Sequence, residues 1–434
     1  MLSPKLGLAC ILFFCINFFQ LASAEPTDKF ASEPDAWRFS GQILARSEMD
    51  GRDFDSSTNP IFWTVTRTRL GVAKSFFDQH LDFFMQIQDS RTLGDLGVAI
   101  GNLQNIDLYQ GYFQIHHLLD QELSLQIGRF ELEYGNGRLF HPLSGWNYLG
   151  QSFDGGRLKL SLPDFYKLKA DAFSLLIKNS TTAIRNPTPT AYPLEADTSQ
   201  GIHGIWASAE LDPAAKLDAF AYYENYQRQS KVGFSDINRW TMGINHQGSY
   251  LDGFLSSSFD VDYQRGQVSD QSVNAYLVAA AMTLHPGEFQ LGAGFDLVSG
   301  NPSTSTTTNN AFGQPYGNNF VYYGTMDYFL NIPNNTQNLG LNDFYLKSSW
   351  APAEWPIELV LQAHHFMANQ TASNGFNLFG QELDLTLTYK HGNNKYIWGL
   401  SGFLPGNLFS SDLFFGSQRN QPAFWSYLQA IVNF

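Results

Sequence analysis

Two arginines spaced two residues apart, Arg67 and Arg69, are the side chains whose type and spacing first suggest a chemical role. They lie in the stretch 63–73, WTVTRTRLGVA, whose threonines and valines favour a β-strand. Because strand side chains alternate between two faces, both guanidinium groups share one face. Unpaired guanidinium groups would be very costly in an apolar core, so this face must contact water, a partner or a charged ligand.

Side chains suited to catalysis or metal binding are sparse. The adjacent histidines form two pairs, at 116–117 and 364–365. Neighbours on a strand face opposite sides, so neither pair can chelate a metal ion within one strand. A hydrolase would also need a nucleophile beside a base on one face. We therefore predict no enzyme activity, no metal site and no cofactor.

Two carboxylates, Asp89 and Asp154, are alternative candidates for general acids. Ion pairs of Asp89 with Arg91 and of Asp154 with Arg157 are the simpler interpretation. An outer-membrane hydrolase is therefore the less favoured alternative function.

The elements that must position these residues are β-strands. Apolar and polar residues alternate over most of the chain, and helical periodicity is absent after residue 24. Roughly eighteen segments of about ten residues predict an all-β fold, a transmembrane antiparallel β-barrel. The predicted strands are 37–47, 61–75, 80–90, 106–117, 121–131, 153–162, 166–178, 200–211, 215–227, 237–248, 253–264, 272–284, 287–298, 342–351, 355–367, 379–390, 394–404 and 421–434.

The connections between these strands alternate in length, with short turns at one end and long loops at the other. Short periplasmic turns and long extracellular loops are typical of membrane barrels. A soluble propeller or solenoid would show a fixed-period repeat, which is absent, and sandwich strands are usually shorter. The predicted long loops are 48–60, 91–105, 132–152, 179–199, 299–341 and 405–420.

The loop 299–341 is rich in aromatic residues, which a purely disordered loop seldom is. We predict that part of it folds into the barrel or caps it. The alternative is an external loop that packs on neighbouring loops.

Both ends of the chain favour an outer-membrane location. Lys5, the apolar run 6–21 and the small residues 22–24 predict a signal peptide over residues 1–24, which contains both cysteines. Residues 25–434 are then one barrel domain. Alternating apolar residues lead to the terminal Phe434, a pattern that resembles the recognition signal of the outer-membrane assembly machinery. A net charge of −14 argues against nucleic acid as a partner.

Alternation also assigns the charged residues to the inside of the barrel. An arginine facing lipid near the midplane would cost about 2–4 kcal/mol, whereas a wide barrel has an aqueous lumen. One wall is predicted to be basic and the facing wall acidic, and such walls select solutes. Alternatively, the charges pair and only brace the lumen. The inward basic residues are Arg46, Arg67, Arg69, Arg157, Lys159, Lys167 and Lys169, and the acidic ones are Asp260, Asp262, Asp296, Asp343, Glu358, Glu382 and Asp384.

Five motifs, taken in their order and spacing, resemble the alginate-export family of outer-membrane porins. They are QDSR at 88–91, GRFELEYGNGRL at 128–139, SFDG at 152–155, GQELDL at 380–385 and FLPG at 403–406. The resemblance covers nearly the whole chain after residue 24.

The resemblance implies an eighteen-stranded monomeric barrel in the outer membrane of a Gram-negative bacterium. It also implies an arginine-rich constriction, with loops and turns that gate the pore. Arg129 is in phase with outward residues, so either a bulge turns it inward or it lies at the rim. The implied solute path includes Arg67, Arg69, Arg91, Arg129, Arg138, Arg157 and Lys159, with Asp89, Asp154, Glu382 and Asp384 beside them.

We therefore predict an outer-membrane porin that passes an anionic or polar solute, including an anionic polysaccharide such as alginate. The chain itself is acidic, so the prediction is not restricted to alginate. The main rival is an adhesin or structural barrel whose lumen is plugged and whose extracellular loops bind a partner.

Overall fold

The fold was analysed in a computed structural model of the whole chain. The structure describes residues 36–94, 106–120, 122–143, 145–178, 198–212, 214–228, 237–302 and 307–434. The predicted signal peptide and most of the predicted loops 91–105 and 179–199 lie outside these residues.

Eighteen long strands account for nearly all of the regular structure, and each coincides with a predicted strand to within a few residues. The described helices are short, namely the 3-10 turn Leu118–Asp120, α3 (Asn319–Tyr322) and α4 (Ile332–Asn335). No helix among the described residues is long and apolar enough to cross a membrane. The strands are β1 (Arg38–Gly51), β2 (Ile61–Phe76), β3 (Leu81–Thr92), β4 (Ile106–Ile115), β5 (Leu123–Phe130), β6 (Phe153–Leu162), β7 (Leu168–Lys178), β8 (Thr198–Asp212), β9 (Ala215–Arg228), β10 (Ile237–Tyr250), β11 (Leu255–Val268), β12 (Gln271–Leu284), β13 (Phe289–Val298), the two-residue β14 (Thr308–Asn309), β15 (Leu341–Trp350), β16 (Ile357–Met367), β17 (Leu378–His391), β18 (Asn394–Pro405) and β19 (Ala423–Asn433).

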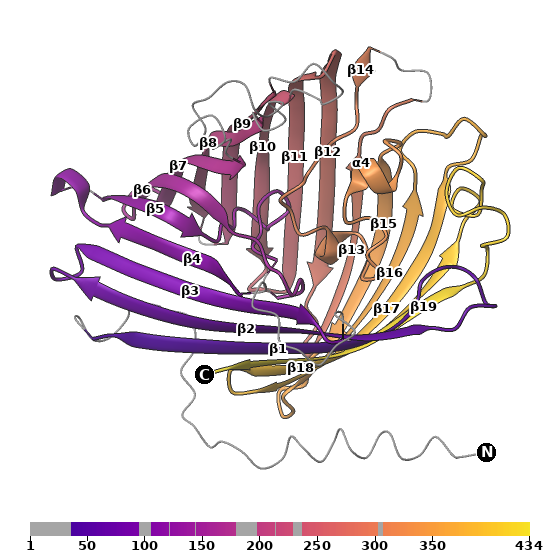
Figure 1. The fold of residues 1–434 in the computed structure, drawn as a ribbon, viewed down its shortest axis with the longest axis horizontal. Coiled ribbons are helices and arrows are strands. Elements are labelled where there is room, and N and C mark those ends of the chain that lie inside the picture. Colours follow the sequence, from indigo (N-terminus) through magenta and orange to yellow (C-terminus); the bar gives the residue numbers. More distant parts are fainter. Residues whose placement is uncertain are drawn as a thin grey trace, which may run out of the picture.

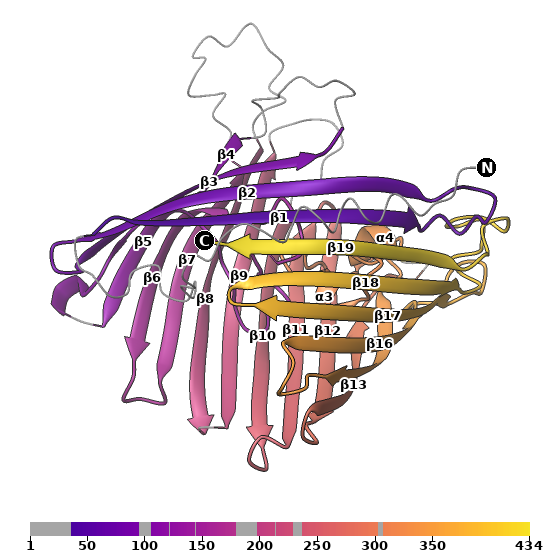
Figure 2. The same cartoon turned by 90° about the horizontal axis from the view of Figure 1, so that it is seen from below.

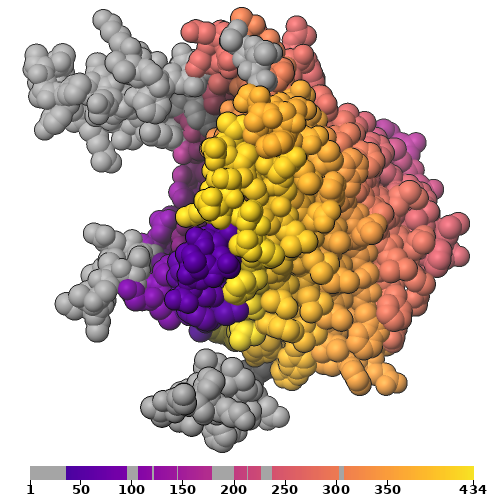
Figure 3. All heavy atoms as spheres, turned by 90° about the vertical axis from the view of Figure 1, so that its right-hand side faces the viewer, coloured from indigo at the N-terminus to yellow at the C-terminus, as the bar shows by residue number. Residues whose placement is uncertain are grey.

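The strands form one closed antiparallel barrel, which confirms the predicted fold class. Each long strand pairs with the next along the chain, and β1 pairs with β19, so that Gln42 lies opposite Asn433. The short β14 pairs in parallel with β12. It is not one of the strands that form the wall of the barrel, because β13 pairs directly with β15. Figure 2 shows β1 beside β19, and Figure 3 shows the C-terminal strands in yellow against the indigo of β1.

The two faces of the wall differ as alternation predicts. On β2, Arg67 and Arg69 are buried inside the barrel, whereas Leu70 on the opposite face is exposed. On β17, Glu382 faces inward and Leu383 faces outward. An apolar outer face is what a barrel in a bilayer requires, because no water is present there to solvate polar groups.

Two long connections fill much of the barrel interior. The segment 131–152 follows β5, and the segment 307–340 precedes β15 and carries α3 and α4 inside the ring of strands (Figure 1). They contact each other, since the Asn318 amide donates to the Gly137 carbonyl (3.1 Å) and the His141 amide to the Tyr316 carbonyl (3.0 Å). The predicted inward folding of part of 299–341 is therefore confirmed.

Candidate solute path

Arg67 and Arg69 face the lumen as predicted, but a loop covers them. Arg67 is fully buried and Arg69 is 4% exposed. The Arg69 guanidinium lies 3.6 Å from the centroid of the Tyr109 ring and 3.5 Å from a carboxylate oxygen of Glu131. Its Nε donates to the Gln88 side chain at 2.7 Å. Of the predicted contacts of this face, which were water, a partner or a charged ligand, the structure shows a partner supplied by the chain itself.

The covering loop binds the wall through five successive carbonyl oxygens, those of residues 145–149. Each accepts a hydrogen bond from an inward side chain, and the five donors come from β19, β1, β2 and β3. The segment thus runs across the strands, around the inside of the wall. The donor–acceptor pairs are Gln429–Gly145 (3.4 Å), Arg46–Trp146 (2.7 Å), Arg67–Asn147 (2.8 Å), Ser90–Tyr148 (2.9 Å) and Gln88–Leu149 (2.7 Å).

Aromatic packing adds to this attachment. The Trp146 ring lies 4.1 Å from the Arg46 guanidinium and stacks on Phe320 of the second loop. Trp425 and Tyr427 of β19 meet its edge. Arg46 is also paired with a carboxylate of its own strand, so part of its charge is already neutralised.

Arg138 crosses from the first loop to the acidic wall. Its guanidinium lies 2.6 Å from an oxygen of Asp296 on β13 and 3.3 Å from one of Asp260 on β11. It also donates to the Tyr323 hydroxyl (3.0 Å) and lies 3.8 Å from the Tyr322 ring centroid. Burial opposes the charge, but the two carboxylates outweigh burial and hold the pKa of Arg138 well above its usual range.

Glu382 and Asp384 bind the second loop, which is the segment 307–340. A Glu382 oxygen accepts from the Met326 amide at 2.8 Å, and an Asp384 oxygen accepts from the Thr325 hydroxyl at 2.5 Å. The neighbouring Asp327 lies 3.8 Å from Arg52. Its partial burial outweighs the attraction of that guanidinium and raises the pKa of Asp327 to about 7.

Arg157 and Lys159 lie on the inner face of β6. Arg157 contacts Gln126 at 2.7 Å and Asp171 at 3.2 Å, not Asp154 as the sequence suggested. Lys159 contacts the Gln114 side chain at 3.3 Å. Lys167, predicted to face inward, instead lies in the turn before β7 and pairs with Glu210.

Four of the predicted path residues lie on the outer face, near the extracellular ends of their strands. Asp89 and Arg91 lie opposite Thr68 and Thr66, which share the face opposite to Arg67. They pair with each other at 2.7 Å. The predicted place of Asp89 and Arg91 in the lumen is therefore wrong, because a resemblance in residue types does not determine which face of β3 a residue occupies.

Arg129 and Asp154 are the other two. They lie opposite each other on β5 and β6 and form a 2.9 Å ion pair that is partly exposed. Gln126 is buried inside and Ile127 is 54% exposed outside, so alternation continues to Arg129 without a bulge that turns it inward. Arg129 thus lies at the rim, where it also lines a cavity of about 450 Å³ together with Gln88, Ser90 and Leu149.

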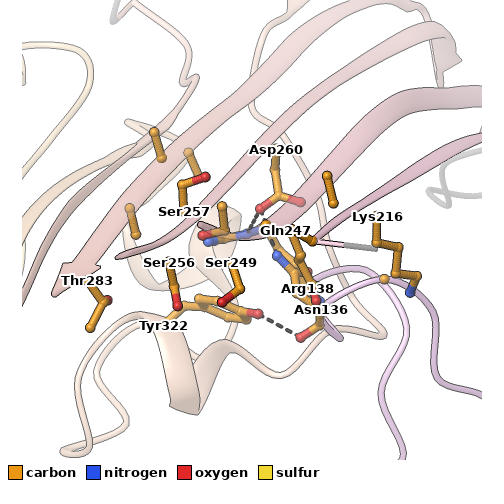
Figure 4. Close-up of a pocket in the computed structure, with 18 of the residues that line it drawn as sticks. Asn136, Arg138, Lys216, Gln247, Ser249, Ser256, Ser257, Asp260, Thr283 and Tyr322 are labelled. Carbon is orange, nitrogen blue, oxygen red and sulfur yellow. Dashed lines mark hydrogen bonds and ion pairs between the residues drawn. The ribbon is translucent and has the colours of Figure 1, made fainter. Parts of the chain in front are cut away.

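A cavity of about 760 Å³ lies below Arg138, toward the short turns. Hydroxyl, amide and charged side chains line it together with alanines and glycines, and Asn136 and Arg138 contact the Asp260 carboxylate there (Figure 4). The Tyr322 hydroxyl crosses it to donate to the Asn136 carbonyl at 2.7 Å. The polar lining residues include Gln247, Ser249, Ser256, Ser257, Ser258 and Thr283.

The histidine pairs do not form a metal centre in the described part of the chain. No group of three or more histidine, cysteine, aspartate or glutamate residues there is placed to hold a metal ion. His364 is buried against Asp343 at 2.8 Å, and His116 lies 2.7 Å from Asp82. Each contact joins side chains of two neighbouring segments of the barrel wall, as an ion pair when the histidine is protonated and as a hydrogen bond when it is neutral.

Sequence reasoning missed the loop segment 145–149 and its uncharged donors Gln88, Ser90 and Gln429. Glutamine and serine on a strand give no signal of their own. The alternation of strand side chains could have assigned these three residues to the inner face. Their hydrogen-bond partners could be identified only once the position of the loop was known.

Comparison with known proteins identifies what this chain is similar to. A family model described as alginate export matches residues 52–411. Crystal structures of Pseudomonas aeruginosa OccK10 (OpdN) and OpdL match with TM-scores of 0.59 at 12% and 13% identity. These matches cover 91% and 92% of this chain and 99% and 98% of those chains.

A third structure, Pseudomonas aeruginosa OpdK with vanillate, matches with a TM-score of 0.55 at 11% identity and covers 91% of this chain and 98% of that chain. At these identities the likeness shows the fold alone. No curated protein matches this chain.

Proposed function

The chain belongs to the alginate export family and is an outer-membrane β-barrel channel, and from this premise we propose a solute and a way in which it passes. The solute is anionic or rich in oxygen atoms. It replaces the loop segment 145–149 on the inner wall of the barrel. The observation that carries this proposal is the set of five inward donors on five successive carbonyl oxygens. Carboxylate and hydroxyl oxygens of a solute accept from the same donors.

Displacement of the loop supplies the gating step. In the closed state, the backbone carbonyls of Trp146 and Asn147 accept from Arg46 and Arg67. Other acceptors of these guanidinium groups are the Glu48 carboxylate and the Gln42 side chain. When the loop is displaced, a carboxylate of the solute replaces the carbonyl oxygens as hydrogen-bond acceptor of Arg46 and Arg67. It also balances the charge of these two guanidinium groups. Several weak contacts along the wall allow a solute to move on without being trapped.

The natural solute is a small anion or a polysaccharide. OpdK, which shares the fold, was solved with vanillate, a small carboxylate. This observation supports a small carboxylate as one candidate, and the row of donors along 145–149 supports an extended one. Passage is passive in both cases, through hydrogen bonds and ion pairs with the inward side chains.

Planar-bilayer recording tests the proposal. The full-length barrel is expected to open rarely, and a variant lacking residues 145–149 is expected to stay open. Polygalacturonate, an oxygen-rich polyanion, should block the open variant, and neutral dextran of similar length should not. Equal block by both polymers would contradict the proposed anion binding.

A plugged adhesin or structural barrel is the second candidate, favoured by one specific observation. Both loops are firmly attached inside the lumen, the first through Arg138 and the second through Glu382. This candidate predicts that the full-length barrel never conducts. Discrete conductance steps of the full-length barrel, even rare ones, would exclude it.

Four further features belong to the proposal. The channel is a monomer and does no catalysis, and the contacts of His364 with Asp343 and of His116 with Asp82 support a structural role for these two histidines. Residues 1–24 direct secretion and are removed. Phe434, whose amide and carbonyl pair with Gly41 of β1, is the signal read by the assembly machinery.

A further inference from the structure

A second basic region lies on the inner face of β4–β7, toward the short turns, and the segment 131–152 reaches it through Tyr134. A cavity of about 330 Å³ is lined there by Lys159, Lys169 and His116, together with the hydroxyls of Ser124 and Ser161. This volume is at the lower end of the range of small-molecule sites.

The strand register brings these groups to one face. Lys159 lies directly opposite Ser124 on β5, and Lys169 lies opposite Ser161 on β6 and Ser208 on β8. Residues paired across antiparallel strands share a face, so both ammonium groups and their hydroxyl neighbours point to the lumen.

Two carboxylates, Asp171 and Glu122, also line the cavity. Asp171 accepts from Arg157 at 3.2 Å and from the Tyr134 hydroxyl at 2.9 Å. Asp82 contacts His116 at 2.7 Å, and Glu122 is exposed in the turn before β5.

Lys159 and Lys169 form no ion pair with any described carboxylate. The lysines of the neighbouring wall differ in this respect, because Lys167 pairs with Glu210 and Lys216 with Asp218. A lysine in a concave site without a carboxylate partner offers its charge to a ligand.

We propose that this cavity is a carboxylate-binding site near the periplasmic end of the channel, sized for one sugar acid. The two lysines bind the carboxylate, and Ser124, Ser161 and Gln114 bind hydroxyl groups. The site rests on the proposed function, because it gives an anionic solute its first contact on the periplasmic side of the barrel.

Binding of D-glucuronate to the purified full-length barrel in detergent tests the site, with D-glucose as the neutral probe. Isothermal titration should detect glucuronate and not glucose. The variant Lys159→Met/Lys169→Met should weaken glucuronate binding by at least about tenfold, since hydrogen bonds to charged groups are lost. Lys167→Met, which removes a paired lysine at the same end, should leave binding unchanged.

The charge-conserving variant Lys159→Arg/Lys169→Arg controls for folding and should retain glucuronate binding. Equal binding by the wild type and the methionine variant would overturn the site, as would no glucuronate binding by the wild type. Titration requires no ion current, so the outcomes separate. If the barrel conducts anions selectively but the methionine variant binds glucuronate as the wild type does, the proposed site is wrong and the channel function stands. If glucuronate binding depends on the two lysines but the barrel never conducts, the proposed channel function is wrong and the site stands.

Discussion

The Arg138 guanidinium lies 2.6 Å from the Asp296 carboxylate, and this contact joins a loop inside the barrel to the acidic wall. Asp296 is fully buried, so its charge depends on Arg138. The pairing explains why one basic and one acidic wall coexist in this lumen. Arginines of the basic wall bind the loop backbone, and the loop supplies its own arginine to the carboxylates opposite.

Replacing Arg138 with glutamine should release the first loop. The change leaves Asp296 and Asp260 buried without a cation, and loss of one partner of a buried pair typically costs about 3–5 kcal/mol. We expect a higher open probability in planar bilayers and faster proteolysis between residues 131 and 152.

Arg129→Gln is the matched control for this substitution. It removes an arginine from a partly exposed pair with Asp154 on the outer face, where about 0–1 kcal/mol is expected. Equal effects of the two substitutions would show that Arg138 does not hold the loop.

Gly324→Ala should release the second loop. Gly324 has a φ of 79°, and a Cβ atom there would lie 2.6 Å from the Glu382 carboxylate. Both the backbone conformation and the contact disfavour alanine. We expect larger single-channel conductance.

Gly375→Ala separates these two effects, because Gly375 has a φ of 83° and open space around its Cβ position. The Gly375→Ala substitution therefore introduces an alanine at a positive φ but no close contact of its Cβ atom with another side chain. A conductance change of the same size in both variants would mean that close approach to Glu382 is unimportant.

The attachment of the second loop should weaken as pH rises. The pKa of Asp327 is raised to about 7 by partial burial, against the attraction of Arg52, so the docked loop holds its proton more tightly than the released loop. Docking is therefore most favourable below the ordinary aspartate pKa and weakens as pH rises through about 7. Open probability should rise by about tenfold or more between pH 5 and pH 8.

Asp327→Asn should remove this dependence and stay near the low-pH level, because an amide resembles the protonated carboxyl. Arg46 and Glu48 also face this site and serve as the fixed charges around it. A pH profile that persists in Asp327→Asn would assign the titration to another group.

How far the sequence predicts this molecule depends on the kind of contact involved. All eighteen long strands and the inward face of Arg67 follow from alternation, since a strand repeats every two residues. The same rule places Asp89 and Arg91 on the outer face, whereas a motif resemblance compares residue types and carries no information about the face.

The covering of Arg67 by the Asn147 carbonyl was not predictable in the same way. Backbone carbonyls carry no sequence signal, and the distance in sequence between the two residues gives no hint of contact. The same reasoning applies to Arg138, whose partners lie on β11 and β13. Long-range contacts between a loop and a barrel wall depend on the whole fold.

The reversal potential across a bilayer under a salt gradient tests the central claim most directly, which is that Arg67 and Arg69 line the path of an anion. In the variant lacking 145–149, we predict anion preference, and adding Arg67→Glu/Arg69→Glu should shift the reversal potential toward cations. Arg91→Glu, on the outer face, should not shift it. An unchanged reversal potential in the Arg67→Glu/Arg69→Glu variant would contradict the account.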